Sequence, residues 1–165
     1  MRFRTALLAL LATLPLMVFA EQPTFRKKFN AAAKEMVPVL QTTNCTTKPV
    51  KKVPGKAITE CELQMPNSLL TFDSMNGQLA GVWLMMDSSK LDHPSDIMRT
   101  GGMLLRAARG ASYGDYLAVA AKALDMSRQQ GGKEVCLNDK ESAARFCVSS
   151  NDRGIFDMTL QPTGN

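Results

Sequence analysis

The stretch Leu69-Leu-Thr-Phe-Asp-Ser-Met-Asn-Gly-Gln-Leu-Ala-Gly-Val-Trp-Leu-Met-Met-Asp87 decides the fold that we expect for this chain. Asn76 and Gly77 stand between two apolar runs, and both residue types readily take the positive φ angles of a tight hairpin turn. The second run is apolar on both faces around Trp83. We therefore predict a hairpin whose second strand is central in a sheet, and either covered on both sides or lining a partner site.

The patterns on either side of this hairpin suggest that the chain repeats one plan. In each half, an alanine-rich helical pattern ends at a methionine, Met36 or Met126, and is followed by two cysteines and an apolar strand. Because the order and the offsets match, we interpret residues 24–87 and 115–161 as pseudo-repeats, linked by a helix over residues 94–109. A chance likeness between two α+β segments is the alternative.

This element order predicts an α+β fold. We expect a single antiparallel sheet with helices packed on one face, made of two helix-plus-three-strand repeats joined by a middle helix. Thr24 is a candidate cap for the first helix, Pro94 opens the middle one, and Asp115 is a candidate cap for the last. The length fits one domain with a real core.

Residues 1–20 have the features of a secretory signal. Two arginines precede an apolar run, and Val18 and Ala20 place small residues at the cleavage positions. We predict cleavage before Glu21, which leaves one domain over residues 21–165. With no cysteine after that site and no later apolar run of spanning length, we expect no membrane anchor. The predicted location is the periplasm, with full secretion as the alternative.

Four cysteines in an exported chain most simply form two disulfides, and three connectivities are open to them. The repeat selects Cys45 with Cys61 and Cys136 with Cys147, so that each bond closes a local loop. By the loop-entropy model, each closure stabilises the fold by about 3 kcal/mol. Zinc binding by reduced cysteines is the alternative, but no C-x-x-C pair exists, and we expect no metal.

Charge supplies a candidate partner surface but no nucleic-acid partner. The full chain has a formal net charge of +5, which loss of the signal lowers by two units, too little to indicate nucleic-acid binding. Turn residues between Cys45 and Cys61 predict a protruding basic hairpin, whose simplest interpretation is a solvated loop. The candidate partner-binding residues are Lys48, Lys51, Lys52 and Lys56 of this hairpin and Arg99, Arg106 and Arg109 of the middle helix.

Catalytic motifs are weak in this sequence. Gly110-Ala-Ser-Tyr-Gly114 matches the G-x-S-x-G nucleophile elbow, but a helical pattern precedes it, and the sole histidine, His93, comes before Ser112 in the chain. A link between two helices explains the motif better, and helix capping explains His93 better than a base or a metal ligand. We predict no catalytic residues, no cofactor and no enzymatic activity.

Trp83, Met85 and Met98 are candidate ligand-binding residues, because methionine adapts to varied surfaces and tryptophan anchors contacts. Core filling is the simpler interpretation of all three. We predict an exported non-enzymatic binding protein that docks a protein partner, of the envelope inhibitor or immunity type. The alternatives are a small-molecule or lipid binder with an apolar cleft, or a small serine hydrolase using Ser112. The oligomeric state is left open.

Overall fold

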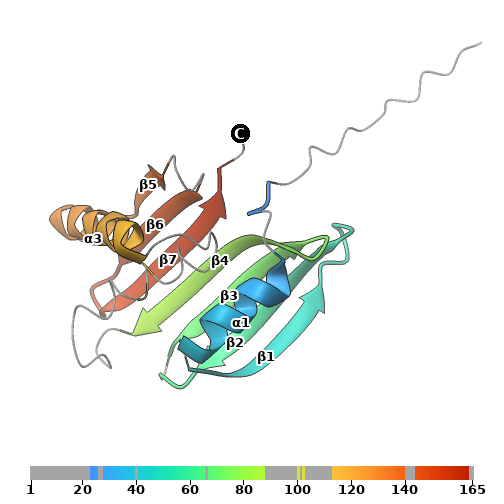
Figure 1. The fold of residues 1–165 in the computed structure, drawn as a ribbon. Helices are drawn as coiled ribbons and strands as arrows, with labels where there is room; N and C mark the ends of the chain where they lie inside the picture. The colour runs from blue at the N-terminus through green and yellow to red at the C-terminus, as the bar shows by residue number, and fades with distance from the viewer. Residues whose placement is uncertain are drawn as a thin grey trace, which may run out of the picture.

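In the computed structural model of this chain, the described residues form two helices and seven strands (Figure 1). The structure describes residues 23–25, 28–39, 41–65, 67–87, 100, 102, 113–139 and 144–163. In chain order the elements are α1 (Phe29–Val39), β1 (Thr42–Pro49), β2 (Lys56–Leu63), β3 (Leu69–Met75), β4 (Gln78–Asp87), α3 (Tyr113–Gln129), β5 (Val135–Asp139), β6 (Ala144–Ser150) and β7 (Ile155–Pro162).

The strands form a single sheet in the order β1-β2-β3-β4-β7-β6-β5, and every neighbouring pair is antiparallel. The turn between β3 and β4 has positive φ angles at Asn76 (50°) and Gly77 (77°), as the sequence predicted for this hairpin. β4 pairs with β3 on one side and with β7 on the other. It is therefore a central strand, and its pairing with β7 joins the two halves of the chain.

The predicted fold class, an α+β fold of two helix-plus-three-strand repeats, is wrong. The described chain is mainly one seven-stranded sheet, and α1 and α3 are its only described helices. Of the expected middle helix over residues 94–109, only Thr100 and Gly102 are described, both buried with helical backbone. The physical reason is that four strands follow α1, and continuous hydrogen bonding through β4 and β7 makes the sheet the dominant layer.

The first helix begins later than the sequence predicted. Phe25 donates its backbone N–H to the Leu79 carbonyl (2.9 Å), and Phe29 donates to the Gly77 carbonyl (2.9 Å). Thr24 donates from its hydroxyl to the Gln78 side-chain oxygen (2.6 Å) instead of capping α1. The segment before α1 is thus held against the start of β4.

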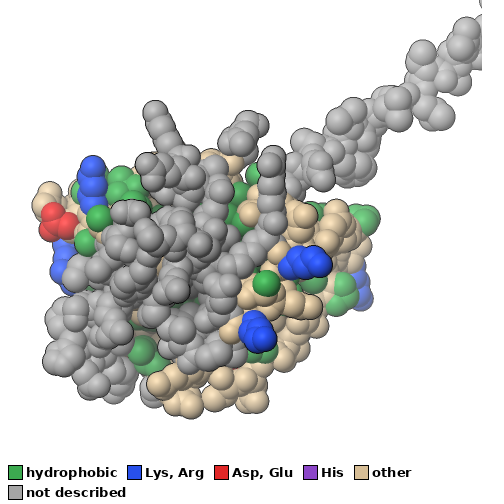
Figure 2. Space-filling view, in the orientation of Figure 1, with side chains coloured by type: hydrophobic (Ala, Val, Ile, Leu, Met, Phe, Trp, Pro, Cys, Tyr) green, Lys and Arg blue, Asp and Glu red, His purple; other side chains and the backbone are tan. Residues whose placement is uncertain are grey.

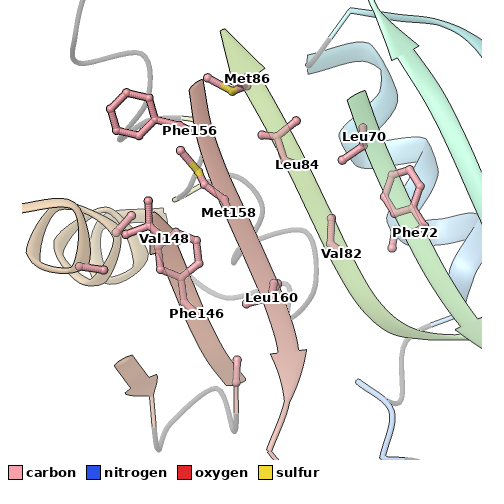
Figure 3. Close-up of a cluster of buried hydrophobic side chains, with 14 of the residues drawn as sticks. Leu70, Phe72, Val82, Leu84, Met86, Phe146, Val148, Phe156, Met158 and Leu160 are labelled. Atoms are coloured by element: carbon pink, nitrogen blue, oxygen red, sulfur yellow. The ribbon is translucent and has the colours of Figure 1, made fainter. Parts of the chain in front are cut away.

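The core lies on one face of the sheet. Side chains at alternate positions point to this face, including Phe72 and Leu84, both fully buried, and Met158 and Phe146 on β7 and β6 (Figure 3). Ala32 of α1 and Ala123 and Leu124 of α3 belong to the same buried cluster. Both helices therefore lie on this face, which we call the helix side. Phe29 of α1 meets the ring of Phe72 edge-on, with centroids 5.7 Å apart.

The opposite face of the sheet carries the remaining alternate side chains. Thr71, Trp83 and Thr159 form one row across β3, β4 and β7, because each lies directly opposite the next in the strand register. We call this the open face, since neither described helix covers it. The exposed Trp83 of the central strand β4 lies on this face.

Candidate binding surface

Two disulfides form, Cys45–Cys61 and Cys136–Cys147, as the sequence predicted. Each joins residues directly opposite one another on neighbouring strands, with Cα atoms 4.1 Å and 4.0 Å apart. The bonds lie on opposite faces of the sheet: Cys61 belongs to the buried cluster of the helix side, whereas Cys147 pairs with Thr159 in the open-face row. Together they indicate an oxidising, exported environment.

One group of potential metal ligands occurs among the described residues, formed by Glu134, Cys136 and Cys147. Both cysteines are already joined to each other, and a disulfide offers no thiolate to a metal ion. This group is therefore not a metal site in the oxidised protein.

Several of the predicted site residues lie outside the described residues. They are Ser112 and His93 of the hydrolase alternative, Met98 of the ligand-binding set, and Arg99, Arg106 and Arg109 of the partner-binding set. α3 begins at Tyr113, so the last two residues of the G-x-S-x-G stretch are helical. The roles suggested for the six residues stay predictions.

The predicted hairpin forms from β1 and β2, but its four lysines are not equivalent. Lys48 lies 3.5 Å from the Glu60 carboxylate, and Lys56 lies 3.1 Å from the Asp73 carboxylate. Lys51 and Lys52 are exposed in the turn, and neither forms an ion pair within the described part of the chain. Two of the four positive charges are thus partly compensated by the sheet itself.

The helix side shows no continuous basic patch among its described side chains. In Figure 2, which views the molecule from this side, the coloured lysines and arginines lie apart from one another. Separated surface charges steer a partner weakly, because each is screened by salt over a distance of about 10 Å. The described charges on this side therefore favour no particular docking site.

Trp83 is the most prominent apolar side chain of the open face. It is 36% exposed although it lies in the middle of a central strand, between Thr71 and Thr159. The next open-face residue on β4, Met85, is partly buried and stands between Leu69 and Asp157. Folding therefore leaves part of this large apolar ring exposed to water. Tryptophan is enriched at binding hot spots.

A hollow of about 270 Å³ lies beside Trp83. We call it the Trp83 hollow. Its residues come from β3, β4, the end of β7 and the segment before α1, and they are Pro23, Thr71, Asp73, Ala80, Gly81, Val82, Trp83, Thr159, Leu160, Gln161 and Pro162. Residues from both halves of the chain therefore line the hollow, on either side of the β4–β7 pair.

Local backbone geometry produces the hollow. The register of β3 against β4 shifts between Asp73 and Ser74, which makes Ala80 the extra residue of a β-bulge. Gly81 follows, opposite Asp73, at an open-face position where it has no side chain. A Cβ placed there would meet Asp73 Cβ and the Leu160 carbonyl at 3.6 Å, an ordinary contact distance. Gly81 thus leaves unfilled space that an alanine could occupy.

The lining of the Trp83 hollow combines hydrogen-bonding groups with one charge. Thr71 Oγ1 is buried and has no hydrogen-bond partner among the described residues. A buried hydroxyl left unpaired destabilises a fold by about 1–3 kcal/mol. Asp73 is the one charged side chain among the described lining residues. These features suit a ligand group that donates hydrogen bonds.

The open face around the hollow carries more acidic than basic side chains. The strand register places Glu60, Glu62, Asp73, Asp87 and Asp157 on this face, together with Lys48, Lys56 and Arg145. Glu62 and Asp157 form no ion pair with any described residue. This local balance has the opposite sign to the net charge of the whole chain.

In comparisons with protein-family models, curated proteins and solved structures, nothing matches this chain. No helix within the described ranges is long and apolar enough to cross a membrane.

Sequence reasoning singled out Trp83 and Met85 but missed the hollow. The signal that could have found it is Gly81, which interrupts an otherwise apolar strand. Glycine inside a strand often marks a bulge or a place where another group approaches closely. The contributions of Thr159 and Gln161 could not be found in this way, because they depend on the pairing of β4 with β7.

Proposed function

We propose that this protein is an exported, non-enzymatic binding protein that docks a protein partner through the open face of its sheet. Two disulfides support export, and so does the signal-like sequence of residues 1–20. The periplasm is the proposed location, and an inhibitor or immunity role in the cell envelope is the proposed type of action.

One observation carries the docking proposal: Trp83 is 36% exposed at the centre of the open face. Interface hot spots are enriched in tryptophan and lie in pockets near the middle of an interface. The Trp83 hollow and the flanking Met85 give the surface both relief and apolar area. A partner that covers Trp83 would gain apolar burial that folding alone does not supply.

The lysine tip of the β1–β2 hairpin would act at the margin of this interface. Lys51 and Lys52 are exposed and project from the turn between the strands. Charges at the rim of an interface act mainly on the association rate and on the choice of partner. We therefore assign them a steering role that is secondary to Trp83.

The alternative is a small-molecule binder, and the Trp83 hollow is the observation that favours it. Its volume, about 270 Å³, is just below the usual range for ligand pockets. A lipid fits it poorly, because Asp73, Thr71 and Gln161 bring polar groups into the lining. The hollow suits a small polar group better than an acyl chain.

The docking proposal is tested by capture of partners from an envelope extract of the source organism. The bait is the oxidised protein from Glu21 onward, compared with Trp83→Ala and with Val53→Ala. Val53 is a matched control, because it is 39% exposed but lies in the hairpin turn. We expect one stoichiometric partner that the wild type and Val53→Ala retain and Trp83→Ala loses.

Circular dichroism of each variant establishes that loss of capture does not reflect unfolding. A partner retained equally by Trp83→Ala would remove the open face from the interface. Absence of any stoichiometric partner for the folded wild type would favour the small-molecule alternative.

A further inference from the structure

We propose that the Trp83 hollow seats an arginine side chain of the partner. This inference rests on the proposed function, since it names the chemistry that the docking surface recognises. It starts from the size of the hollow, about 270 Å³ and open to solvent beside an exposed aromatic ring. Hot-spot side chains commonly insert into such pockets on the partner, and arginine is among the residues enriched there.

The hydrogen-bonding groups of the hollow match a guanidinium group. Arginine has five N–H donors and no acceptor, so it needs acceptors from its site. Asp73 supplies a carboxylate and Gln161 an amide oxygen to the lining of the hollow. A planar guanidinium also stacks on aromatic rings, and the partly exposed Trp83 is among the residues that line the hollow.

Charge selects a cation over a neutral or anionic ligand. Among the described lining residues none is basic, and the single charge is the Asp73 carboxylate. Glu62 and Asp157 add negative charge to the same face, and neither forms an ion pair with a described residue. A positively charged segment of a partner therefore complements this surface, although the chain as a whole is positively charged.

The ion pair between Lys56 and Asp73 leads to a further prediction about binding. Its ammonium group lies 3.1 Å from Asp73 Oδ2, yet Lys56 is not among the residues that line the hollow. A carboxylate has about four lone-pair sites, so Asp73 can accept from Lys56 and from a guanidinium together. The lysine nevertheless offsets the charge that attracts the ligand. Its removal should strengthen binding of a cation.

The test uses the intrinsic fluorescence of Trp83, the sole tryptophan of the chain. The folded, oxidised protein is titrated with acetyl-Gly-Arg-Gly-amide and with the same peptide carrying citrulline, a neutral isostere of arginine. We expect saturable binding of the arginine peptide with a dissociation constant on the order of 1 mM, since one side chain makes few contacts. Citrulline should bind at least about tenfold more weakly.

Three variants give effects of different sign. Asp73→Asn should weaken binding of the arginine peptide about tenfold, and Lys56→Met should tighten it several-fold. Gly81→Ala should weaken it because the added methyl occupies the hollow, while its 3.6 Å contacts leave the fold intact. Weaker binding in Lys56→Met, equal binding of both peptides, or no saturable change at tens of millimolar peptide would each overturn the inference.

These outcomes are separable from those of the proposed function. A captured partner that depends on Trp83, with no binding of the arginine peptide, leaves the docking role standing and removes the arginine seat. Peptide binding with the predicted signs, without any captured partner, supports the cation site and removes the docking role.

Discussion

The half of the chain formed by α1 and β1–β4 and the half formed by α3 and β5–β7 share an order of elements, yet they differ in construction. The first has four strands and the second three. The first disulfide lies on the helix side, and the second lies on the open face. Because side chains alternate along a strand, a shift of one residue moves a cysteine to the other face. Matched order along the sequence therefore does not make two cysteine pairs equivalent.

The largest expected losses of stability come from the buried phenylalanines, of which we compare one in each half of the chain. Phe72 and Phe146 are both almost fully buried, one in each half. Replacing either by alanine should lower the free energy of unfolding by about 3–5 kcal/mol. Because the sheet is continuous through β4 and β7, each variant should still unfold in one transition in urea. Two separate transitions would show that the halves are independent units.

The two disulfides should contribute unequally to the free energy of unfolding. Removing Cys136–Cys147 by a double alanine substitution should lower the free energy of unfolding by about 3 kcal/mol, through loss of loop closure. Removing Cys45–Cys61 should lower it slightly further, because this bond closes the longer loop, with a sequence separation of 16 against 11, while each pair has one buried cysteine. Urea denaturation of the two double variants gives the comparison. A larger loss on removing Cys136–Cys147 than on removing Cys45–Cys61 would contradict this order.

Glycines in the turns of each half should also respond differently to alanine. Gly132 has φ of 84°, and a Cβ there would collide with the Ser150 backbone carbonyl. We expect Gly132→Ala to lower stability by about 2–3 kcal/mol. Gly131→Ala is the matched control, with φ of 69° and open space, and should lower it by about 1 kcal/mol. Thermal unfolding monitored by circular dichroism measures both changes, and equal losses would contradict this reading of the turn.

In the first half of the chain, the corresponding glycine is Gly55, and the group that an added Cβ would meet there is easier to displace. A Cβ on Gly55 would meet the side chain of Asn76, which can turn away, where Gly132 meets backbone. The backbone N–H of Asn76 in the β3–β4 turn donates to the Gly55 carbonyl in the β1–β2 turn (2.8 Å), and this hydrogen bond should survive the substitution. Gly55→Ala should therefore destabilise the protein less than Gly132→Ala does. The reverse order would show that the hairpin turn is the more rigid of the two.

The smallest expected effect on stability is at the hairpin tip. Reversing charge with Lys51→Glu and Lys52→Glu should change the free energy of unfolding by less than about 0.5 kcal/mol, because both side chains are exposed. The association rate with a captured partner should fall at low salt and recover as salt is added. Unchanged association kinetics at low salt would remove the tip from the interface.

How much of this could be predicted from the sequence depends on how local each feature is. The Asn76-Gly77 turn and both disulfides were predicted correctly, since turn chemistry and short loops are properties of neighbouring residues. The pairing of β4 with β7 joins residues far apart in the chain, and no local pattern specifies it. The repeat interpretation consequently led to the wrong fold class.

The candidate site was predicted only in part, for the same reason. The sequence suggests Trp83 as an anchor for contacts, with core filling as the simpler role, and the structure leaves it partly exposed. The sequence alone does not separate Lys48 and Lys56 from the tip lysines, because their ion pairs depend on the pairing of β2 with its two neighbours. The hollow itself needs the bulge at Ala80 and the approach of β7, both of which are tertiary features.

The measurement that tests the central claim most directly is acrylamide quenching of Trp83 fluorescence, with and without the captured partner. Trp83 is the sole tryptophan of this chain, so with a partner whose own tryptophans are replaced by phenylalanine the signal reports the open face alone. We predict ready quenching in the free protein, in keeping with its 36% exposure, and strong protection in the complex. A quenching constant that stays the same when the partner binds would contradict the claim that the partner docks on the open face.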